Sequence, residues 1–578
     1  MDRFVYLLLC FIPAFLPAQS PEAIWGKRLS VSNPIFSFGK NLAIVDMDYD
    51  ADGFLYAVGF NRATLLDGGS PVHGPYSGAQ TGFVLKMDTD GEILWHRRLT
   101  MGVMKALDVE GGALYVAGDV ASAEYGPLQL EADGTGTVTT IFANGYYDGF
   151  VARYSLAGEL SWARTFGGAD DDDVFEKGDR IEDLAVSSSG QVYITGSYFK
   201  QFRVAGELVF EETSDRGKTF FLAALDGAGA LVWARDIKSP LPTDGGNAEG
   251  LHLAATAQGA AVAIAYSPGG LLINGEILLN DNGGGDRGAL LAHYSTAGSL
   301  LWHRNLEPEL GLMVPLGLGT ASDGQIVVAF AHERQVLIDE AEELEYLQQE
   351  DGLLKTGLAA FNGSGQLLWA KSIFASDASI SVHPDGDIFL GAAAFRTGVQ
   401  LGNGIALDFP GDGAVSLWAR FSKGGEALWA HRPGLLAAAP FSTNHFVLAS
   451  LDKQLYAAAN FNTTLDFGGN IILDNGYESP DFDAFYVVRI DDSNLNALPL
   501  ATVQPLSVYP NPARGAVWAD LPEGMALRLY RLDGQLVWAG QALAGHQRLE
   551  FGPQVPGLYF LKGQGQSGAY LQPLSLVR

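Results

Sequence analysis

Short runs of alternating apolar and polar residues fill almost the whole chain, and turns that contain glycine separate them. One phrase recurs six times, as GFVLKMDTDGEILWHRRL, GFVARYSLAGELSWARTF, FFLAALDGAGALVWARDI, ALLAHYSTAGSLLWHRNL, GLAAFNGSGQLLWAKSI and SLWARFSKGGEALWAHRP. Each copy has a run of alternating apolar and polar residues, a turn and a second alternating run, which is typical of an antiparallel hairpin. Its tryptophans are spaced by 67, 71, 69, 67 and 60 residues and are Trp95, Trp162, Trp233, Trp302, Trp369 and Trp429. The spacing indicates a repeat protein built from hairpins.

A second hairpin precedes each phrase and occurs seven times, for example as ALDVEGGALYVAGDV and IEDLAVSSSGQVYITGSY. Its second strand is rich in alanine and glycine, which suits strands that converge on a narrow axis. Between the two hairpins lies a third recurring piece, such as FRVAGELVF or VQLGNGIALDF, which we expect to elongate its own four-stranded unit. Such a unit cannot bury both faces alone, so the units are predicted to stack around a ring.

The ends of the array predict how the ring closes. The seventh unit lacks the strand that carries tryptophan, and AIWGKRLS near the N-terminus supplies a copy of it, with Trp25 in register 70 residues before Trp95. The predicted fold is therefore all-β: a seven-bladed β-propeller over residues 22–493, closed by an N-terminal strand. The seven tryptophans recur at one strand position, so we interpret them as packing between blades rather than as platforms for sugars.

The repeat resembles the bacterial beta-propeller repeat, which has a Gly-x-Leu-x-Trp outer strand and an Asp-x-x-Gly turn before an inner Tyr-Val-x-Gly strand. The resemblance covers residues 22–493. Quinoprotein-like propellers have related repeats and hold a quinone and calcium, usually beside vicinal cysteines, whereas Cys10 is the single cysteine of this chain. Sialidase-like propellers carry Ser-x-Asp-x-Gly-x-Thr-Trp boxes, which this sequence lacks.

Composition changes after residue 493. A linker rich in Leu, Ala, Pro and Asn is predicted at 494–505, and short strands separated by Pro and Gly over 506–578 predict a small β-sandwich. The segment opens with Tyr509-Pro510-Asn511-Pro512 and ends with basic Arg578. It resembles the C-terminal sorting domain of type IX secretion cargo in Bacteroidota, which implies the type IX secretion machinery as a partner. The alternative is an accessory immunoglobulin-like domain without a sorting role.

The N-terminus predicts export. Arg3 precedes an apolar stretch over residues 4–16 and small Ala18 follows, which is typical of a signal peptide spanning 1–18. The stretch is shorter than the roughly 20 residues that a transmembrane helix needs, so no transmembrane segment is predicted. A lipoprotein acylated at Cys10 fits less well, because bulky Leu9 precedes the cysteine. The predicted location is outside the cell, either secreted or attached to the outer cell surface.

The charge narrows the set of partners. With 36 basic and 66 acidic residues the net charge is −30, which disfavours nucleic acids and anionic membranes. The acidic run Asp170, Asp171, Asp172 and Asp173 is a weak candidate for binding Ca²⁺, against the alternative of a solvated loop.

A second acidic motif resembles a calcium site. Asp48, Asp50, Asp52 and Gly53 copy the start of a calcium loop, but Gly59 stands where a bidentate Glu is required. A hairpin turn is the simpler interpretation of this motif.

The motifs favour binding over catalysis. No metalloprotease HExxH motif, Gly-x-Ser-x-Gly elbow or phosphate-binding loop occurs, so no catalytic or cofactor-binding residue is assigned and no cofactor is predicted beyond that candidate Ca²⁺. We expect a non-enzymatic interaction module that binds a glycan or protein through variable loops such as 170–180 and 240–250. The alternative is an extracellular hydrolase or lyase acting on polysaccharides or peptides, since propeller loops can bring distant carboxylates together.

Overall fold

The chain divides into two compact units, residues 1–494 and 495–578, which are described separately. The computed structural model describes residues 21–32, 41–74, 81–100, 102–121, 127–143, 147–168, 178–211, 219–238, 252–266, 271–273, 276–279, 288–308, 311, 313–338, 342–343, 345–346, 354–394, 398–407, 415–435, 446–451, 454–461, 464–467, 471–474, 484–492, 506–511, 513–521, 524–531, 536–551, 555–565 and 568–577. The predicted signal peptide and linker lie outside these residues.

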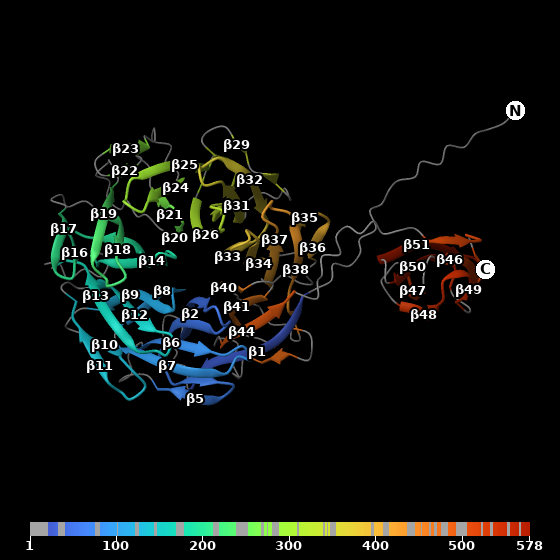
Figure 1. Cartoon of the computed structure of the whole chain (residues 1–578), viewed down its shortest axis with the longest axis horizontal. Helices are drawn as coiled ribbons and strands as arrows, with labels where there is room; N and C mark the ends of the chain where they lie inside the picture. Colours follow the sequence, from blue (N-terminus) through green and yellow to red (C-terminus); the bar gives the residue numbers. More distant parts are fainter. Residues whose placement is uncertain are drawn as a thin grey trace. The chain divides into compact units, whose positions relative to one another are not determined.

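In the described part, the first unit consists of β-strands in antiparallel meanders (Figure 1). Each meander begins with an inner strand, and these are β2 (Leu42–Tyr49), β8 (Gly102–Glu110), β14 (Arg180–Val186), β20 (His252–Thr256), β26 (Met313–Thr320), β33 (Ser376–Val382) and β40 (Phe446–Leu451). The second strands are β3 (Leu55–Asn61), β9 (Ala113–Ala121), β15 (Val192–Tyr198), β21 (Gly259–Tyr266), β27 (Ile326–His332), β34 (Ile388–Ala394) and β41 (Gln454–Phe461).

The third and fourth strands complete each meander. The third strands are β6 (Thr81–Met87), β12 (Tyr147–Ser155), β18 (Thr219–Leu225), β24 (Gly288–Ser295), β31 (Lys355–Phe361), β37 (Val415–Phe421) and β44 (Ala484–Asp491). The fourth strands are β7 (Ile93–Thr100), β13 (Leu160–Phe166), β19 (Leu231–Lys238), β25 (Leu300–Pro308), β32 (Leu367–Ile373), β38 (Ala427–His431) and β1 (Glu22–Val31). We number the sheets from first to seventh in the order of their inner strands.

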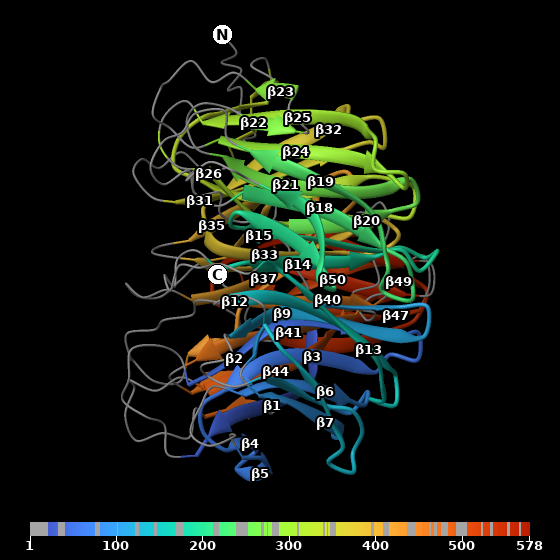
Figure 2. The ribbon, with the colours of Figure 1, turned by 90° about the vertical axis from the view of Figure 1, so that its left-hand side faces the viewer.

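The inner strands contact one another in a cycle. β2 contacts β8, and the contacts continue through β14, β20, β26, β33 and β40 back to β2. Figure 1 shows these strands nearest the common axis, and Figure 2 shows the same sheets from the side. The alanine-rich and glycine-rich second strands therefore lie just outside the axis, where small side chains permit close approach.

The N-terminal strand belongs to the seventh sheet, as the sequence predicts. β1 pairs antiparallel with β44, with Trp25 opposite Arg489, and so provides the fourth strand that the last repeat lacks. The seventh sheet is thus made from both ends of the first unit.

The third recurring piece does not lie where the sequence analysis places it. β16 (Gln201–Val204) and β17 (Glu207–Glu211) follow β15 of the third sheet but extend the second sheet, because β16 pairs with β13. The expectation that this hairpin elongates its own unit was wrong. β15 already has β14 and β18 as neighbours, so the hairpin that follows it finds its open edge on the adjacent sheet.

Four other hairpins follow the same rule, and the remaining short strands pair in other ways. Four pairs extend the preceding sheet, and these are β4 (Leu65–Asp67) with β5 (Ser70–His73), β10 (Leu128–Glu131) with β11 (Val138–Ile141), β22 (Leu271–Ile273) with β23 (Glu276–Leu279), and β28 (Val336–Ile338) with β29 (Glu342–Glu343). The remaining short strands are β30 (Glu345–Tyr346), parallel to β32, β35 (Val399–Gly402) with β36 (Ile405–Leu407), and β39 (Gly434–Leu435) with β42 (Leu465–Asp466) and β43 (Ile472–Leu473).

The tryptophans join neighbouring sheets, which confirms their interpretation as packing residues. Each indole N–H donates a hydrogen bond to the segment that directly follows the third strand of the next sheet. The bonds run from Trp25 to Thr89 O (2.8 Å), Trp95 to Leu156 O (3.2 Å), Trp162 to Gly227 O (3.1 Å), Trp233 to Thr296 O (2.8 Å), Trp302 to Gly363 O (3.0 Å), Trp369 to Lys423 O (2.9 Å) and Trp429 to Asp492 Oδ2 (2.6 Å).

The turn glycines make room for these rings. Gly91 has a φ of +83°, and a Cβ there would lie 2.9 Å from the Trp25 ring. The glycine is therefore required both by its left-handed backbone and by the approach of the indole.

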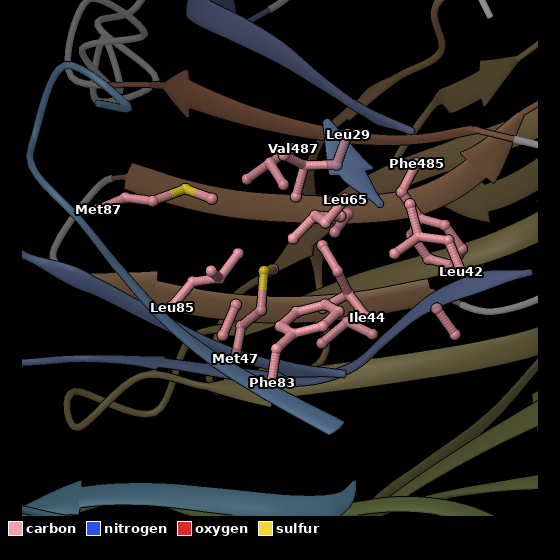
Figure 3. Packing of buried hydrophobic residues seen from close by; sticks show 14 of the residues in the cluster. Leu29, Leu42, Ile44, Met47, Leu65, Phe83, Leu85, Met87, Phe485 and Val487 are labelled. Carbon is pink, nitrogen blue, oxygen red and sulfur yellow. The ribbon is translucent and has the colours of Figure 1, made fainter. Parts of the chain in front are cut away.

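Apolar side chains fill the space between adjacent sheets. Figure 3 shows this core where the seventh and first sheets meet: Leu29 and Val487 come from the seventh, and Met47, Phe83 and Leu85 from the first. Burial of such side chains contributes about 1.5–3 kcal/mol each. The N-terminal strand is thus held by apolar packing as well as by its hydrogen bonds to β44.

The second unit has two sheets that share one core. Their strands are β45 (Ser507–Tyr509), β46 (Ala516–Leu521), β47 (Met525–Arg531), β48 (Leu536–Ala542), β49 (Gly545–Glu550), β50 (Gly557–Gly565) and β51 (Gly568–Leu576). The sheet orders are β45-β46-β49 and β48-β47-β50-β51. Val517 and Leu549 of the three-stranded sheet pack with Leu527 and Leu561 of the four-stranded sheet, as in a small sandwich.

Candidate functional site

A cavity of about 970 Å³ lies along the axis of the first unit. It is lined by residues of all seven inner strands, and its volume is that of a site for a small molecule or a side chain. We call each tryptophan hydrogen bond between neighbouring sheets, with its surrounding contacts, a junction. Because seven junctions hold the sheets around the cavity, the cavity is formed by the fold itself.

The wall of the cavity has two chemically different parts. Strands β2, β8 and β14 contribute an acidic arc, which we define as Asp46, Asp48, Asp108, Glu110, Glu182 and Asp183. Strands β26, β33 and β40 contribute an apolar arc, defined as Leu316, Leu318, Ile380, Val382, Val447 and Leu448. A ligand in the cavity therefore meets carboxylates on one side and aliphatic groups on the other.

Four aspartates of the acidic arc also bind the backbone of the next sheet. Asp46 Oδ2 accepts from Leu107 N and Asp48 Oδ2 from Val109 N, each at 2.8 Å. In the same way Asp108 accepts from Val186 N and Asp183 from Leu253 N, each at 2.7 Å. An inner strand has no strand partner on its axial edge, so these carboxylates satisfy N–H groups that a sheet leaves open.

Burial raises the pKa of these aspartates. Removal from water raises the pKa of Asp48 and of Asp183 to about 7, against the lowering effect of their backbone hydrogen bonds. Burial raises the pKa of Asp46 and Asp108 as well, and the charge of Asp48 adds to the effect on Asp108. The carboxylates thus repel one another, and a cation among them would favour their charged forms.

Single-residue bulges aim further side chains at the cavity. The inner strands shift register at Val45, Lys105, Glu182 and Leu316, and each of these bulged residues lines the cavity. Lys105 Nζ lies 2.9 Å from Glu182 Oε2 and pairs with it across two sheets. A bulge redirects a side chain, so one structural position presents an aliphatic, a basic and an acidic group in different sheets.

The two acidic motifs considered for calcium differ in what the structure describes of them. Asp170, Asp171, Asp172 and Asp173 lie outside the described residues. The loop-like motif is a hairpin turn: Asp50 Oδ1 accepts from Asp52 N and Phe54 N, and its Oδ2 from the Tyr56 hydroxyl at 2.9 Å. Across the described ranges, no group of three or more His, Cys, Asp or Glu side chains is placed to hold a metal ion.

The variable loops are described only in part. Of residues 170–180 the structure describes the last three, and residues 240–250 lie outside it. Buried Asp179 accepts from Gly168 N at 2.7 Å and from Phe199 N at 2.6 Å. This carboxylate fastens the end of its loop to two backbone segments.

One arrangement resembles a catalytic pair. His332 Nε2 lies 2.9 Å from Ser372 Oγ, and His332 Nδ1 lies 2.8 Å from Arg334 O. The exposed fractions of the two residues are 0% and 2%. A substrate has no access to this pair, so it is a buried hydrogen bond rather than a nucleophile with its base.

Sequence reasoning missed most of the acidic arc. The sequence motifs indicate Asp48 only as part of the calcium-like motif, and they do not indicate Asp46, Asp108 or Asp183. A signal was present: Asp48 and Asp108 stand at the same place in their hairpins, opposite Tyr56 and Tyr115. Charged residues repeated in strands predicted to face a narrow axis indicate an axial site.

Comparisons with known proteins leave the family open. No family model matches the chain, and no curated protein does. Among solved structures, the chain is similar to the phage phi92 endosialidase (10% identity, 80% of this chain and 69% of that chain, TM-score 0.33). It is also similar to prolyl oligopeptidase B from Galerina marginata (11%, 73% and 47%, TM-score 0.32) and to the Trypanosoma rangeli sialidase (9%, 84% and 87%, TM-score 0.24).

These likenesses are too distant to carry a functional argument. The chain spans about half the length of the prolyl oligopeptidase chain that it matches. Within the described residues, no helix has the length and apolar character needed to cross a membrane.

Proposed function

We propose that this protein is a secreted or surface-attached binding module, in which a closed seven-bladed β-propeller presents its axial cavity to a cationic, partly aliphatic ligand. The observation that carries the proposal is the division of the cavity wall into an acidic arc and an apolar arc. The cycle of contacts between inner strands and the pairing of β1 with β44 support the closed ring.

The chemistry of the wall selects the ligand class. An ammonium or guanidinium group on an aliphatic stem matches both arcs, because the charge pairs with carboxylates and the stem replaces water at the aliphatic side. Lysine and arginine side chains of a peptide or protein have this form. The net charge of −30 adds a long-range attraction for such a partner.

The roles of the aspartates support binding rather than catalysis. Asp46, Asp48 and Asp108 each hold a backbone N–H of the next sheet. A general acid or base has to reach the reacting atom of its substrate, whereas one oxygen of each of these carboxylates is already held by a backbone N–H. These aspartates are instead part of the cavity wall. A bound cation would neutralise the negative charge of carboxylates that backbone hydrogen bonds already hold in position.

Export is the second part of the proposal. A signal peptide at 1–18 and a type IX sorting domain at 506–578 would act in series, taking the chain across the inner membrane and then the outer membrane. Removal of 506–578 is expected to leave the protein in the periplasm with the first unit folded, since the two units are separately compact. Normal amounts of the shortened protein outside the cell would contradict the sorting role.

The binding part is tested with hexylammonium, 1-hexanol and hexanoate as probes in isothermal titration calorimetry at pH 7.5. Hexylammonium is expected to bind most tightly, and the double variant Asp48→Asn with Asp108→Asn to bind it at least tenfold less tightly. The matched control, Asp90→Asn with Asp133→Asn, removes two carboxylates from exposed turns and should bind as the parent does. Preference for hexanoate, or equal binding by both double variants, would contradict the proposal.

A further inference from the structure

The strand β11 is an open edge of the first sheet. It ends the sheet order β11-β10-β7-β6-β3-β2, and its partner β10 lies on one side only. Val138, Thr139 and Thr140 are exposed, with an exposed fraction of 47% for Val138, and Phe142 beyond the strand has 62%. Its backbone N–H and C=O groups on the open side therefore lie at the surface, as in any edge strand.

The composition of this edge differs from that of two equivalent edges, β5 and β17. Residues 137–143 read TVTTIFA, without charge or proline, in a chain of net charge −30. The equivalent strand β5 contains Pro71, and β17 carries exposed Glu207 and Glu211 at its two ends. Proline and like charges at an edge prevent pairing with another strand, and β11 has neither protection.

We propose that β11 pairs antiparallel with β11 of a second copy of this chain, which joins two first sheets edge to edge. A two-fold axis beside Thr140 sets Thr140 opposite Thr140 of the second copy, and Val138 opposite Phe142 of the second copy. Threonine pairs and pairs of aromatic with β-branched residues are favourable cross-strand contacts. The same arrangement at β17 would bring glutamates together, so β17 lacks this self-complementarity.

The size of the contact sets its strength. A four-residue strand and one exposed phenylalanine bury less than the roughly 800 Å² per partner of a stable interface. The association is therefore weak in dilute solution and becomes significant where copies are concentrated, as on a surface. This inference is independent of the ligand proposed for the axial cavity.

The test uses the full purified chain in sedimentation equilibrium from 10 μM to 1 mM. The parent is expected to form dimers in the upper part of this range. Thr140→Asp and Thr140→Lys each place like charges opposite one another, so each variant alone should dimerise at least tenfold more weakly. An equimolar mixture of the two should form dimers again, because the introduced carboxylate of one copy then faces the introduced ammonium group of the other.

The control Ser188→Asp adds a carboxylate to an exposed turn and should dimerise as the parent does, and unchanged thermal unfolding shows that the variants fold. A parent that stays monomeric to 1 mM would overturn the proposal. Dimers that Thr140→Asp leaves unchanged, or a mixture that stays monomeric, would overturn it as well.

Discussion

The periphery of the first unit and its axis are built in opposite ways. Between neighbouring sheets the same contact occurs again and again, with an indole N–H bonded to the end of the next sheet's third strand, as at Trp25 and Trp233. Around the axis the strands differ, from the aspartates of β2 to the leucines of β26. Positions that repeat are held by packing, and positions that diverge within the same frame are available for recognition.

The largest effect is expected from removing the strand that joins the two ends. Deleting residues 22–30 leaves one edge of β44 open, with β41 still paired on the other edge, and removes Leu29 from the core between the seventh and first sheets. An exposed strand edge promotes aggregation and proteolysis. The shortened chain is expected to unfold at a clearly lower temperature and to be cut faster by protease, and unchanged unfolding would contradict the role of β1.

The next largest loss of stability is expected from disrupting a single junction between two sheets. Trp233→Ala removes a buried ring and its bond to Thr296 O, so the unit is expected to lose about 3–5 kcal/mol of stability. Denaturant unfolding measures this loss. Trp518→Ala in the second unit is the control, because that side chain is 40% exposed and lies outside the first unit. Equal losses in the two variants would argue against a special role for the junction.

Substitutions at two glycines distinguish the loss of stability caused by backbone strain from the loss caused by crowding the tryptophan ring at a junction. Gly91 and Gly190 have nearly the same φ, +83° and +82°, but only Gly91 faces an indole, while a Cβ at Gly190 meets nothing within 4 Å. Gly190→Ala should cost about 1 kcal/mol for its backbone alone. Gly91→Ala should cost more, since the Trp25 ring has to move. Equal losses of unfolding free energy would show that the ring tolerates a methyl group there.

The last effect concerns the acidic arc and depends on pH. Asp48 and Asp183 have folded-state pKa values of about 7, above those of the unfolded chain. Their contribution to stability is therefore complete below about pH 4 and is lost as the pH rises through 7. Asp48→Asn with Asp183→Asn is therefore expected to gain stability relative to the parent as the pH rises from 4.5 to 8.

Unfolding of this double variant and of the parent at the two pH values measures the gain. Comparing two proteins at each pH removes the contribution of the histidines, which both share. A difference between the proteins that does not change with pH would mean that these carboxylates are not destabilised by burial.

The sequence predicts the periphery well and the axis poorly, for physical reasons. Alternation and the spacing of Trp95 and its equivalents predict the strands and their junctions, because local pattern and repetition carry that information. The partner of β16 is not predictable in this way, since pairing at an open edge depends on which sheet lies beside it. A bulge at Lys105 turns a side chain toward the axis without any change in composition, so alternation alone does not reveal the wall of the cavity.

The central claim is that the acidic arc receives a cation, and counting the protons released on binding tests it most directly. Titrating hexylammonium at pH 7 in two buffers with different heats of ionisation gives this number. A cation next to Asp48 and Asp108 lowers their raised pKa values, so the parent is expected to release protons on binding, and Asp48→Asn with Asp108→Asn to release far fewer. Binding without proton release in the parent, or equal release by the parent and the double variant, would contradict the account.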